Sequence, residues 1–319
     1  MQNSEEIRIK KIDGLVNGNN KYGWIRDIKY FIISGGKTGS TTLSSSFKRS
    51  IHIHSKEELH SIYPVFKELN IEPIDLIRYN YQINKEKPWV ITAYREPISR
   101  AISSFFEHYD KYIPGGLESN LNINDIISIF NDIYMEYLET YDPILMKDCV
   151  GDIDAIYQKP FNHQEGYQVY DQPLYRLLLL KFDKIKSWPN IINKVMSPID
   201  LKNFSYCSRN ISSSKKYHSL YTHFKNNFYT TRYLVSLRFN IFTHYNSYIN
   251  TPSELNDIKN HWYSLCPLTD YKYVRLPDNF QWTKYVSYYN DLQANYINTE
   301  IKAKQHWILF GHTESRKYT

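Results

Sequence analysis

A loop of small and hydroxyl residues has the composition of a phosphate-binding segment. It reads Lys-Thr-Gly-Ser-Thr-Thr-Leu from Lys37 to Leu43 and follows an apolar run. Successive backbone N–H groups of such a loop can converge on phosphate oxygens, and a lysine at its start can neutralise their charge. The candidate ligand-binding residues of this loop are Lys37, Thr38, Gly39, Ser40, Thr41 and Thr42. Taken alone, the same residues fit a Ser/Thr helix cap beside a lysine equally well.

The order of the loop residues excludes the common triphosphatase motif. In GxxxxGK[ST] a glycine stands five positions before the Gly-Lys pair, whereas Phe31 stands five positions before Gly36-Lys37, and Gly39 follows the lysine. The loop therefore predicts a phosphate site of another kind.

A second segment also has the composition of a phosphate-binding site. It reads Arg-Glu-Pro-Ile-Ser-Arg-Ala-Ile-Ser from Arg95 to Ser103, after another β-favouring run. The guanidinium of Arg95 can bind a terminal phosphate in a fork, and Ser103, about two turns into the following helix, can point back to it. Both segments then lie at the carboxyl edge of one sheet, where open α/β sheets bind their ligands.

The elements that position these residues alternate between strands and helices. We expect strands at 29–33, 51–54, 74–79 and 88–94, and helices from 41, at 57–69 and from 97. Further along we expect helices at 123–139 and 172–187, a short strand at 153–157, and a mainly helical tail from 211. This alternation predicts an α/β fold with a central parallel β-sheet flanked by helices and a mainly helical C-terminal extension.

Together the two segments resemble the motifs of sulfotransferases that use 3′-phosphoadenosine 5′-phosphosulfate (PAPS). In that family a Lys-x-Gly-Thr-Thr-like loop binds the 5′-phosphosulfate, and Arg-x-Pro-x-x-Arg-x-x-Ser binds the 3′-phosphate. The run from Arg95 looks most like the Golgi-type carbohydrate sulfotransferases. This chain departs from the family at Gly36, where proline is common, and at Ser40, which replaces the first threonine.

A weaker resemblance lies further along the chain. The segment Ser-Lys-Lys-Tyr-His-Ser from Ser214 is similar to a Lys-Trp-Tyr-Ser segment of bacterial proteins assigned to capsular polysaccharide synthesis. It implies that Lys216 and Tyr217 contact the cofactor or an acidic acceptor. The main resemblance covers about a quarter of the chain and implies a P-loop-like sheet and a single domain over 1–319. Within it, 24–110 would form the PAPS-binding core and 111–319 the helical remainder that binds the acceptor.

Sulfonate transfer requires a base for the acceptor hydroxyl as well as positioned charge. The resemblance implies that Lys37 contacts the leaving phosphate, that no metal takes part, and that the product is adenosine 3′,5′-bisphosphate. His54 is the first candidate for the base because it ends a strand at the expected site, and an imidazole titrates near neutral pH. His52, on the same face of that strand, is the second, and His60, Glu57 and Glu58 are the other candidates.

The composition limits the range of partners. The formal charge of +6 favours anionic ligands, but the basic residues are scattered, so a nucleic-acid partner is not predicted. The isolated Cys149, Cys207 and Cys266 predict neither a disulfide framework nor a metal site. A polar N-terminus and the short apolar run 177–180 indicate a cytoplasmic protein without an integral membrane segment.

The leading function is therefore transfer of a sulfonate group from PAPS to a hydroxyl of a carbohydrate or polysaccharide, as in the biosynthesis of a bacterial capsule. The 30 tyrosines suit stacking on sugars. Two alternatives remain: a nucleotide-dependent kinase with a variant phosphate loop, and a non-catalytic glycan-binding protein with this fold.

Overall fold

The chain folds into two compact units, each made of several segments. The computed structural model describes residues 4–135, 159–208, 215–241, 247–266, 276–277, 279–294, 297, 300–307, 311–312 and 314–319. The first unit, here called the sheet unit, comprises Met1–Glu96, Tyr141–Ile211 and Thr243–Pro252. The second, the helical unit, comprises Pro97–Thr140, Ser212–Phe242 and Ser253–Thr319. The border between them falls inside the second motif, between Glu96 and Pro97.

A five-stranded sheet forms the centre of the sheet unit, in the order β2-β1-β3-β5-β4. Its strands are β1 (Tyr30–Ile33), β2 (Ser50–Ile53), β3 (Trp89–Tyr94), β4 (Tyr167–Asp171) and β5 (Arg176–Lys181). All neighbours are parallel except β4, which is antiparallel to β5. The predicted strands 29–33, 51–54 and 88–94 are confirmed to within one residue at each end, as is the α/β class with a mostly parallel sheet and flanking helices.

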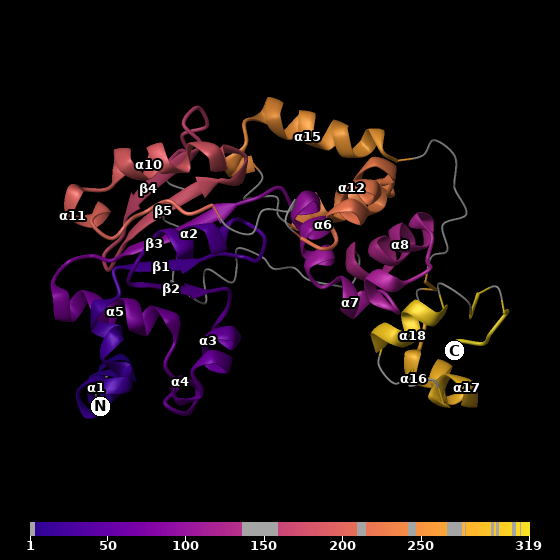
Figure 1. Cartoon of the computed structure of the whole chain (residues 1–319), viewed down its shortest axis with the longest axis horizontal. Coiled ribbons are helices and arrows are strands. Elements are labelled where there is room, and N and C mark those ends of the chain that lie inside the picture. Colours follow the sequence, from indigo (N-terminus) through magenta and orange to yellow (C-terminus); the bar gives the residue numbers. More distant parts are fainter. Residues whose placement is uncertain are drawn as a thin grey trace. The chain divides into compact units, whose positions relative to one another are not determined.

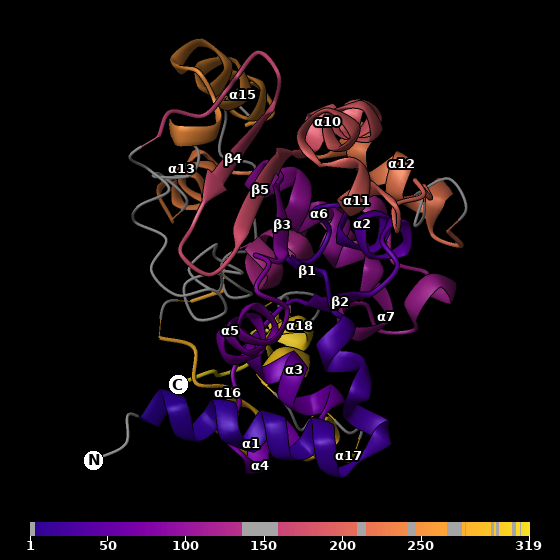
Figure 2. The same cartoon turned by 90° about the vertical axis from the view of Figure 1, so that its left-hand side faces the viewer.

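Alternation along the strands divides the core of this unit into two layers. Tyr30 and Ile32 face a layer that includes Trp188. Phe31 and Ile33 face the opposite layer, which includes Phe66. Figures 1 and 2 show α10 and α11 on one side of the sheet and α1, α3, α4 and α5 on the other. Both faces are covered, as parallel sheets require.

The helices of the sheet unit are mostly short. They are α1 (Ser4–Gly18), η1 (Asn20–Asp27), α2 (Ser40–Ser46), α3 (Lys56–Ile62), α4 (Pro64–Glu68), α5 (Pro73–Asn84), η5 (Phe182–Ser187), α10 (Trp188–Val195) and α11 (Pro198–Leu201). The predicted helix 57–69 is divided into α3 and α4 at Pro64, which has no N–H to continue the first helix.

Two predicted elements were of the wrong type. Residues 74–79, expected as a strand, lie in α5, which begins at Pro73 and has a capping box formed by Glu72 and Asp75. Residues 172–187, expected as a helix, contain β5, whose Leu177–Leu180 run is buried. A strand covered on both faces has a continuous apolar run, which periodicity cannot distinguish from a buried helix. The prediction of a helical region after 111 therefore missed β4 and β5.

The helical unit packs around an aromatic core. Its elements are α6 (Pro97–Glu107), α7 (Tyr109–Tyr112), η2 (Gly116–Glu118), α8 (Ile123–Ile129), the π-helix η3 (Phe130–Met135), α12 (His218–Asn227), α13 (Arg232–Ile241), α15 (Pro252–Ser264), α16 (Trp282–Ser287), α17 (Asn290–Ala294) and α18 (Glu300–His306). The predicted apolar stripe of α6 is buried in this core, with Phe105 and Phe106 at its centre. The described part of the tail is helical, as expected, and the strand expected at 153–157 lies outside the described residues.

Among the described residues, none of the helices combines the length and apolarity needed to cross a bilayer. Cys207 and Cys266 carry free thiols. Cys149 lies outside the described residues.

Candidate functional site

The first motif forms a tight loop between β1 and α2. Lys37 has φ +66° and Gly39 has φ +88°, so two of its residues adopt the left-handed region. Such conformations turn successive N–H groups toward one side of the chain, an arrangement found in anion-binding loops. Because α2 has only seven residues, the loop backbone and its charged side chains matter more here than the helix dipole.

The ring of Trp188 leaves no room for a side chain at position 39. A Cβ atom placed on Gly39 would lie 2.7 Å from Cη2 of Trp188 and 3.0 Å from its Cζ3. The ring is fully buried, and its Nε1 donates to the carbonyl of Lys181 at 3.1 Å. The loop is therefore braced from inside the sheet unit by a residue of α10.

The hydroxyl residues of the loop divide into inward and outward positions. Thr38, Ser40 and Thr42 are buried, whereas Thr41 is exposed. The hydroxyl of Thr38 donates to the carbonyl of Gly35 at 2.8 Å and lies 3.0 Å from Oγ of Ser34. It stabilises the loop itself, which leaves the backbone N–H as the group that Thr38 can offer to a ligand.

Arg95 connects the second motif to the first. It follows the end of β3, and its Nη1 donates to the carbonyl oxygen of Lys37 at 2.9 Å. Its guanidinium lies 4.5 Å from the ring centre of Phe182, in cation–π contact. The structure thus brings together Lys37 and Arg95, the two basic residues on which the sequence prediction mainly depended.

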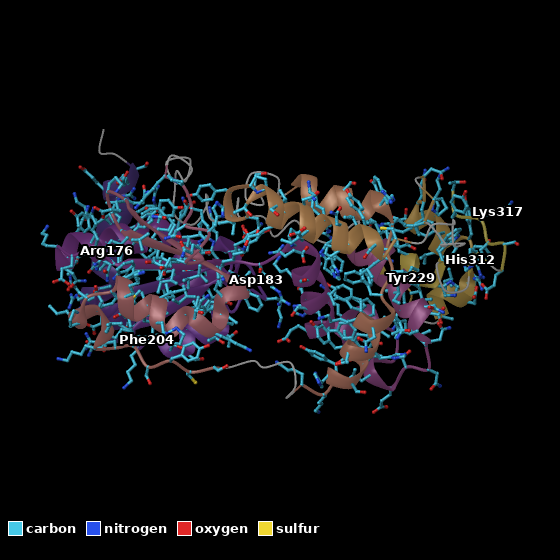
Figure 3. All side chains as sticks on the ribbon, turned by 90° about the horizontal axis from the view of Figure 1, so that it is seen from above. Arg176, Asp183, Phe204, Tyr229, His312 and Lys317 are labelled. Carbon is cyan, nitrogen blue, oxygen red and sulfur yellow. The ribbon has the colours of Figure 1, made fainter. Side chains whose placement is uncertain are left out.

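The carboxyl edge of the sheet carries a further cation. Lys181 ends β5 in register with Tyr94, the last residue of β3, and is buried. Figure 3 labels Arg176 at the start of β5 and Asp183 just beyond its end, and so marks the two edges of the sheet. Lys37, Arg95 and Lys181 all belong to the carboxyl edge.

His54 is attached to the same loop. Its Nδ1 lies 2.7 Å from the carbonyl oxygen of Ser34, and because a carbonyl only accepts, Nδ1 carries the proton. The backbone N–H of His54 donates to the carboxylate of Glu58. This tautomer leaves Nε2 of His54 as the basic nitrogen, with no hydrogen-bond partner among the described residues.

His52 has a different environment. Burial, together with the neighbouring His54, lowers the pKa of His52 to about 4. Its ring centre lies 4.3 Å from that of His54 in an edge contact, and its Nε2 is buried without a partner in the described part of the chain. His52 is therefore neutral near pH 7, and it supports His54 through packing.

The remaining predicted residues belong to the helical unit. Ser103 is a half-buried residue of α6. The hydroxyl of Tyr217 donates to Oε2 of Glu107 at 2.9 Å, while Nζ of the neighbouring Lys215 lies 3.5 Å from Oε1 of the same carboxylate. Lys216 is exposed. That Ser103, Lys216 and Tyr217 contact the cofactor remains a prediction.

Sequence reasoning missed several residues of this site. Ser34 connects the loop to His54, and its place next to the glycines offered a signal. Lys181, which ends β5, and Phe182 and Trp188, which follow it, offered none, because the region 172–187 was predicted as helix. Among the residues that the structure describes, no group of three or more His, Cys, Asp or Glu has the arrangement of a metal site.

No protein-family model, no curated protein and no solved structure matches this chain.

Proposed function

We propose that this protein is a PAPS-dependent sulfotransferase that modifies a hydroxyl group of a carbohydrate. The observation that carries the proposal is the hydrogen bond from Arg95 to the carbonyl of Lys37. Each of the two motifs resembles one half of a PAPS site, although they are far apart in the sequence. This bond joins them at the carboxyl edge of a mostly parallel sheet. Ligands of open α/β sheets bind at this edge.

The donor set of the loop is chemically suited to a phosphosulfate. Lys37 supplies positive charge, and the backbone N–H groups of a loop with two left-handed residues supply uncharged donors. Arg95 and Ser103 are the residues that would hold the 3′-phosphate. PAPS supplies an activated sulfonate group, whose transfer produces adenosine 3′,5′-bisphosphate.

His54 is suited to act as the general base. The hydrogen bond to Ser34 fixes its tautomer, so that Nε2 can take a proton from an acceptor hydroxyl while Nδ1–H stays bonded to the loop. Lys37 neutralises charge on the departing phosphate. The base and the positive charge are therefore both attached to one loop, which favours a constant distance between them.

The remaining parts of the proposal rest on the sequence rather than on the structure. They are a P-loop-like core, a polysaccharide acceptor such as a bacterial capsule, a cytoplasmic site of action, and cofactor contacts from Lys216 and Tyr217. The exposed Thr41 is the loop hydroxyl best placed to meet a ligand, because Thr38 is engaged inward.

Binding of adenosine 3′,5′-bisphosphate tests the proposal directly. We expect it to raise the melting temperature, as any ligand specific for the folded state does, and ATP with Mg²⁺ to do much less. Lys37→Ala should abolish the shift, whereas Lys48→Ala, which removes an exposed lysine just after α2, should preserve it.

Transfer of label from PAPS to a panel of polysaccharides then tests the chemistry. Incorporation that requires Lys37 and His54 supports a sulfotransferase. Bisphosphate binding without incorporation favours a glycan-binding protein that keeps the fold. ATP turnover that depends on Mg²⁺, without response to bisphosphate, favours a kinase and contradicts the proposal.

A further inference from the structure

A second charged pocket lies at the opposite, amino edge of the same sheet. It has a volume of about 210 Å³ and lies within the sheet unit. Lys29 and Trp89 place it beside the starts of β1 and β3, and Arg176 beside the start of β5. Lys37, Arg95 and His54 do not line it, so it is separate from the candidate active site.

Arg176 is held rigidly at this pocket. Its guanidinium stacks on Trp89, 4.3 Å from the ring centre. Its Nη1 and Nη2 each donate to a carboxylate oxygen of Asp200 at 3.3 Å, and Nη2 also approaches the carbonyl of Lys87 at 3.3 Å. Because Trp89 and Asp200 already hold this guanidinium in one orientation, it loses little conformational entropy when it binds a ligand.

Both carboxylate oxygens of Asp200 accept hydrogen bonds from Arg176. Burial alone would raise its pKa, but hydrogen bonding from Ser197 and the charge of Arg176 lower the pKa below its usual value. Ser197 donates from its hydroxyl at 2.9 Å, in the capping box of α11. Asp200 thus stays ionised and orients Arg176.

The pocket contains more basic side chains than acidic ones. Five basic residues line it, namely Arg26, Lys29, Arg49, Lys87 and Arg176, against three carboxylates. The guanidinium of Arg49 has no ion pair or hydrogen bond within the described ranges, although its backbone is fixed by the bond from the N–H of Lys29 to its carbonyl at 3.0 Å. Among the described residues, Nζ of Lys29 has one ion-pair partner, Glu86 at 4.0 Å, and that carboxylate is 72% exposed.

We propose that this pocket binds the phosphate or sulfate group of a small ligand, between the oriented guanidinium of Arg176 and the uncommitted guanidinium of Arg49. Two guanidinium groups that retain unused N–H donors match the several oxygens of a tetrahedral dianion. The pocket volume suits a small ligand rather than a whole nucleotide. This proposal does not depend on the protein being a sulfotransferase.

Anion binding in a Lys37→Ala background tests the proposal, because that change removes the lysine of the candidate active site, and comparison with Arg49→Gln separates the pocket from the Arg95 half of that site. Inorganic phosphate, inorganic sulfate and glucose 6-phosphate are titrated calorimetrically at constant ionic strength, with chloride as the balancing ion. Arg49→Gln added to Lys37→Ala should weaken phosphate binding about 10-fold or more, as expected for loss of a charge-assisted hydrogen bond. Lys48→Gln removes the same charge from the adjacent exposed residue, which does not line the pocket, and should leave the affinity within about twofold.

Each outcome is decisive. Equal weakening by Arg49→Gln and Lys48→Gln, or no phosphate binding in the Lys37→Ala protein, overturns the proposal. Tighter binding of glucose 6-phosphate than of phosphate, lost in Arg49→Gln, supports a phosphorylated metabolite, and equal binding of the two supports the free anion. Failure of bisphosphate binding at Lys37 leaves these readouts unaffected, which separates this proposal from the proposed function.

Discussion

Nη1 of Arg95 donates to the carbonyl oxygen of Lys37 at 2.9 Å, so the end of β3 holds the loop that follows β1. This contact gives Arg95 a positioning role in addition to any contact with ligand. It uses one of five N–H donors of the guanidinium and leaves the planar group stacked on Phe182.

Arg95→Lys and Arg95→Ala should both weaken binding of adenosine 3′,5′-bisphosphate by about 10- to 100-fold, the effect of losing a charge-assisted hydrogen bond of about 1.5–3 kcal/mol. Lysine retains the charge but lacks the planar fork and the stacking on Phe182. Titration calorimetry measures the affinity, with Lys48→Ala as the control. Wild-type affinity in Arg95→Lys would show that charge alone matters and that the bond to the loop does not.

Gly39→Ala should destabilise the sheet unit by about 2 to 5 kcal/mol. About 1–2 kcal/mol comes from placing a Cβ in the left-handed region, and about 1–3 from the clash with Trp188. Gly36→Ala is the matched control in the same loop, since a Cβ there meets nothing within 4 Å. Urea unfolding of both variants measures the difference. Similar losses of stability in the two would contradict the bracing role of Trp188.

His54→Ala should lower kcat by about 100-fold or more, within the range of general-base catalysis, while bisphosphate affinity changes little. His52→Leu should keep turnover within a few-fold, because His52 is neutral near pH 7 and packs against the ring of His54. Single-turnover transfer of label measures the rate. The opposite ranking of the two variants would identify His52 as the base.

Protonation of His52 should make stability depend on pH. The unfolded chain binds this proton near pH 6.5 and the folded chain only near pH 4, so the free energy of unfolding should decrease as the pH falls from 6.5 toward 4. His52→Leu removes this titration, and its stability should decrease less over that interval. Urea unfolding at pH 7 and pH 5 gives the comparison. Parallel losses in the wild type and the variant would place the proton on another group.

Tyr217→Phe and Lys216→Ala separate a structural role from a ligand-binding one. Loss of the bond from Tyr217 to Glu107 should cost about 0.5–1.5 kcal/mol of stability. Lys216 is exposed, so its removal should leave stability unchanged and, under the proposed function, weaken binding of the bisphosphate. Thermal melts with and without ligand report both quantities. An unchanged ligand shift in Lys216→Ala would exclude this residue from the site.

The sequence predicted the strands that precede the two motifs because each is a β-favouring run that ends at a distinct loop or helix start. The predicted strands 29–33 and 88–94 are correct to within one residue. Residues 172–187 could not be assigned correctly, since Leu177–Leu180 is an unbroken apolar run in a strand buried on both faces. Proline and an acidic cap marked the start of α5, but the β-favouring residues after Pro73 led to the wrong assignment.

The residues of the candidate site likewise fall into those that the sequence could predict and those that it could not. Lys37 and Arg95 could be found because residue type and spacing specify them, and the structure brings them into contact. Trp188 and Phe182 could not, because their contribution depends on β5 lying beside β3, a long-range pairing with no local signal. The tautomer of His54 likewise depends on the carbonyl of Ser34, a backbone atom whose position no residue type reveals.

Trp188 also has a consequence for biosynthesis. The loop at Lys37 is translated before Trp188, and the ring that supports Gly39 follows the loop by about 150 residues. The segment Pro97–Thr140 belongs to the other unit and is translated in between. The nascent loop must therefore wait, without its internal support, until β5 and α10 have been synthesised. A fragment that ends soon after the second motif would contain both motifs but not the residues that give the loop its shape.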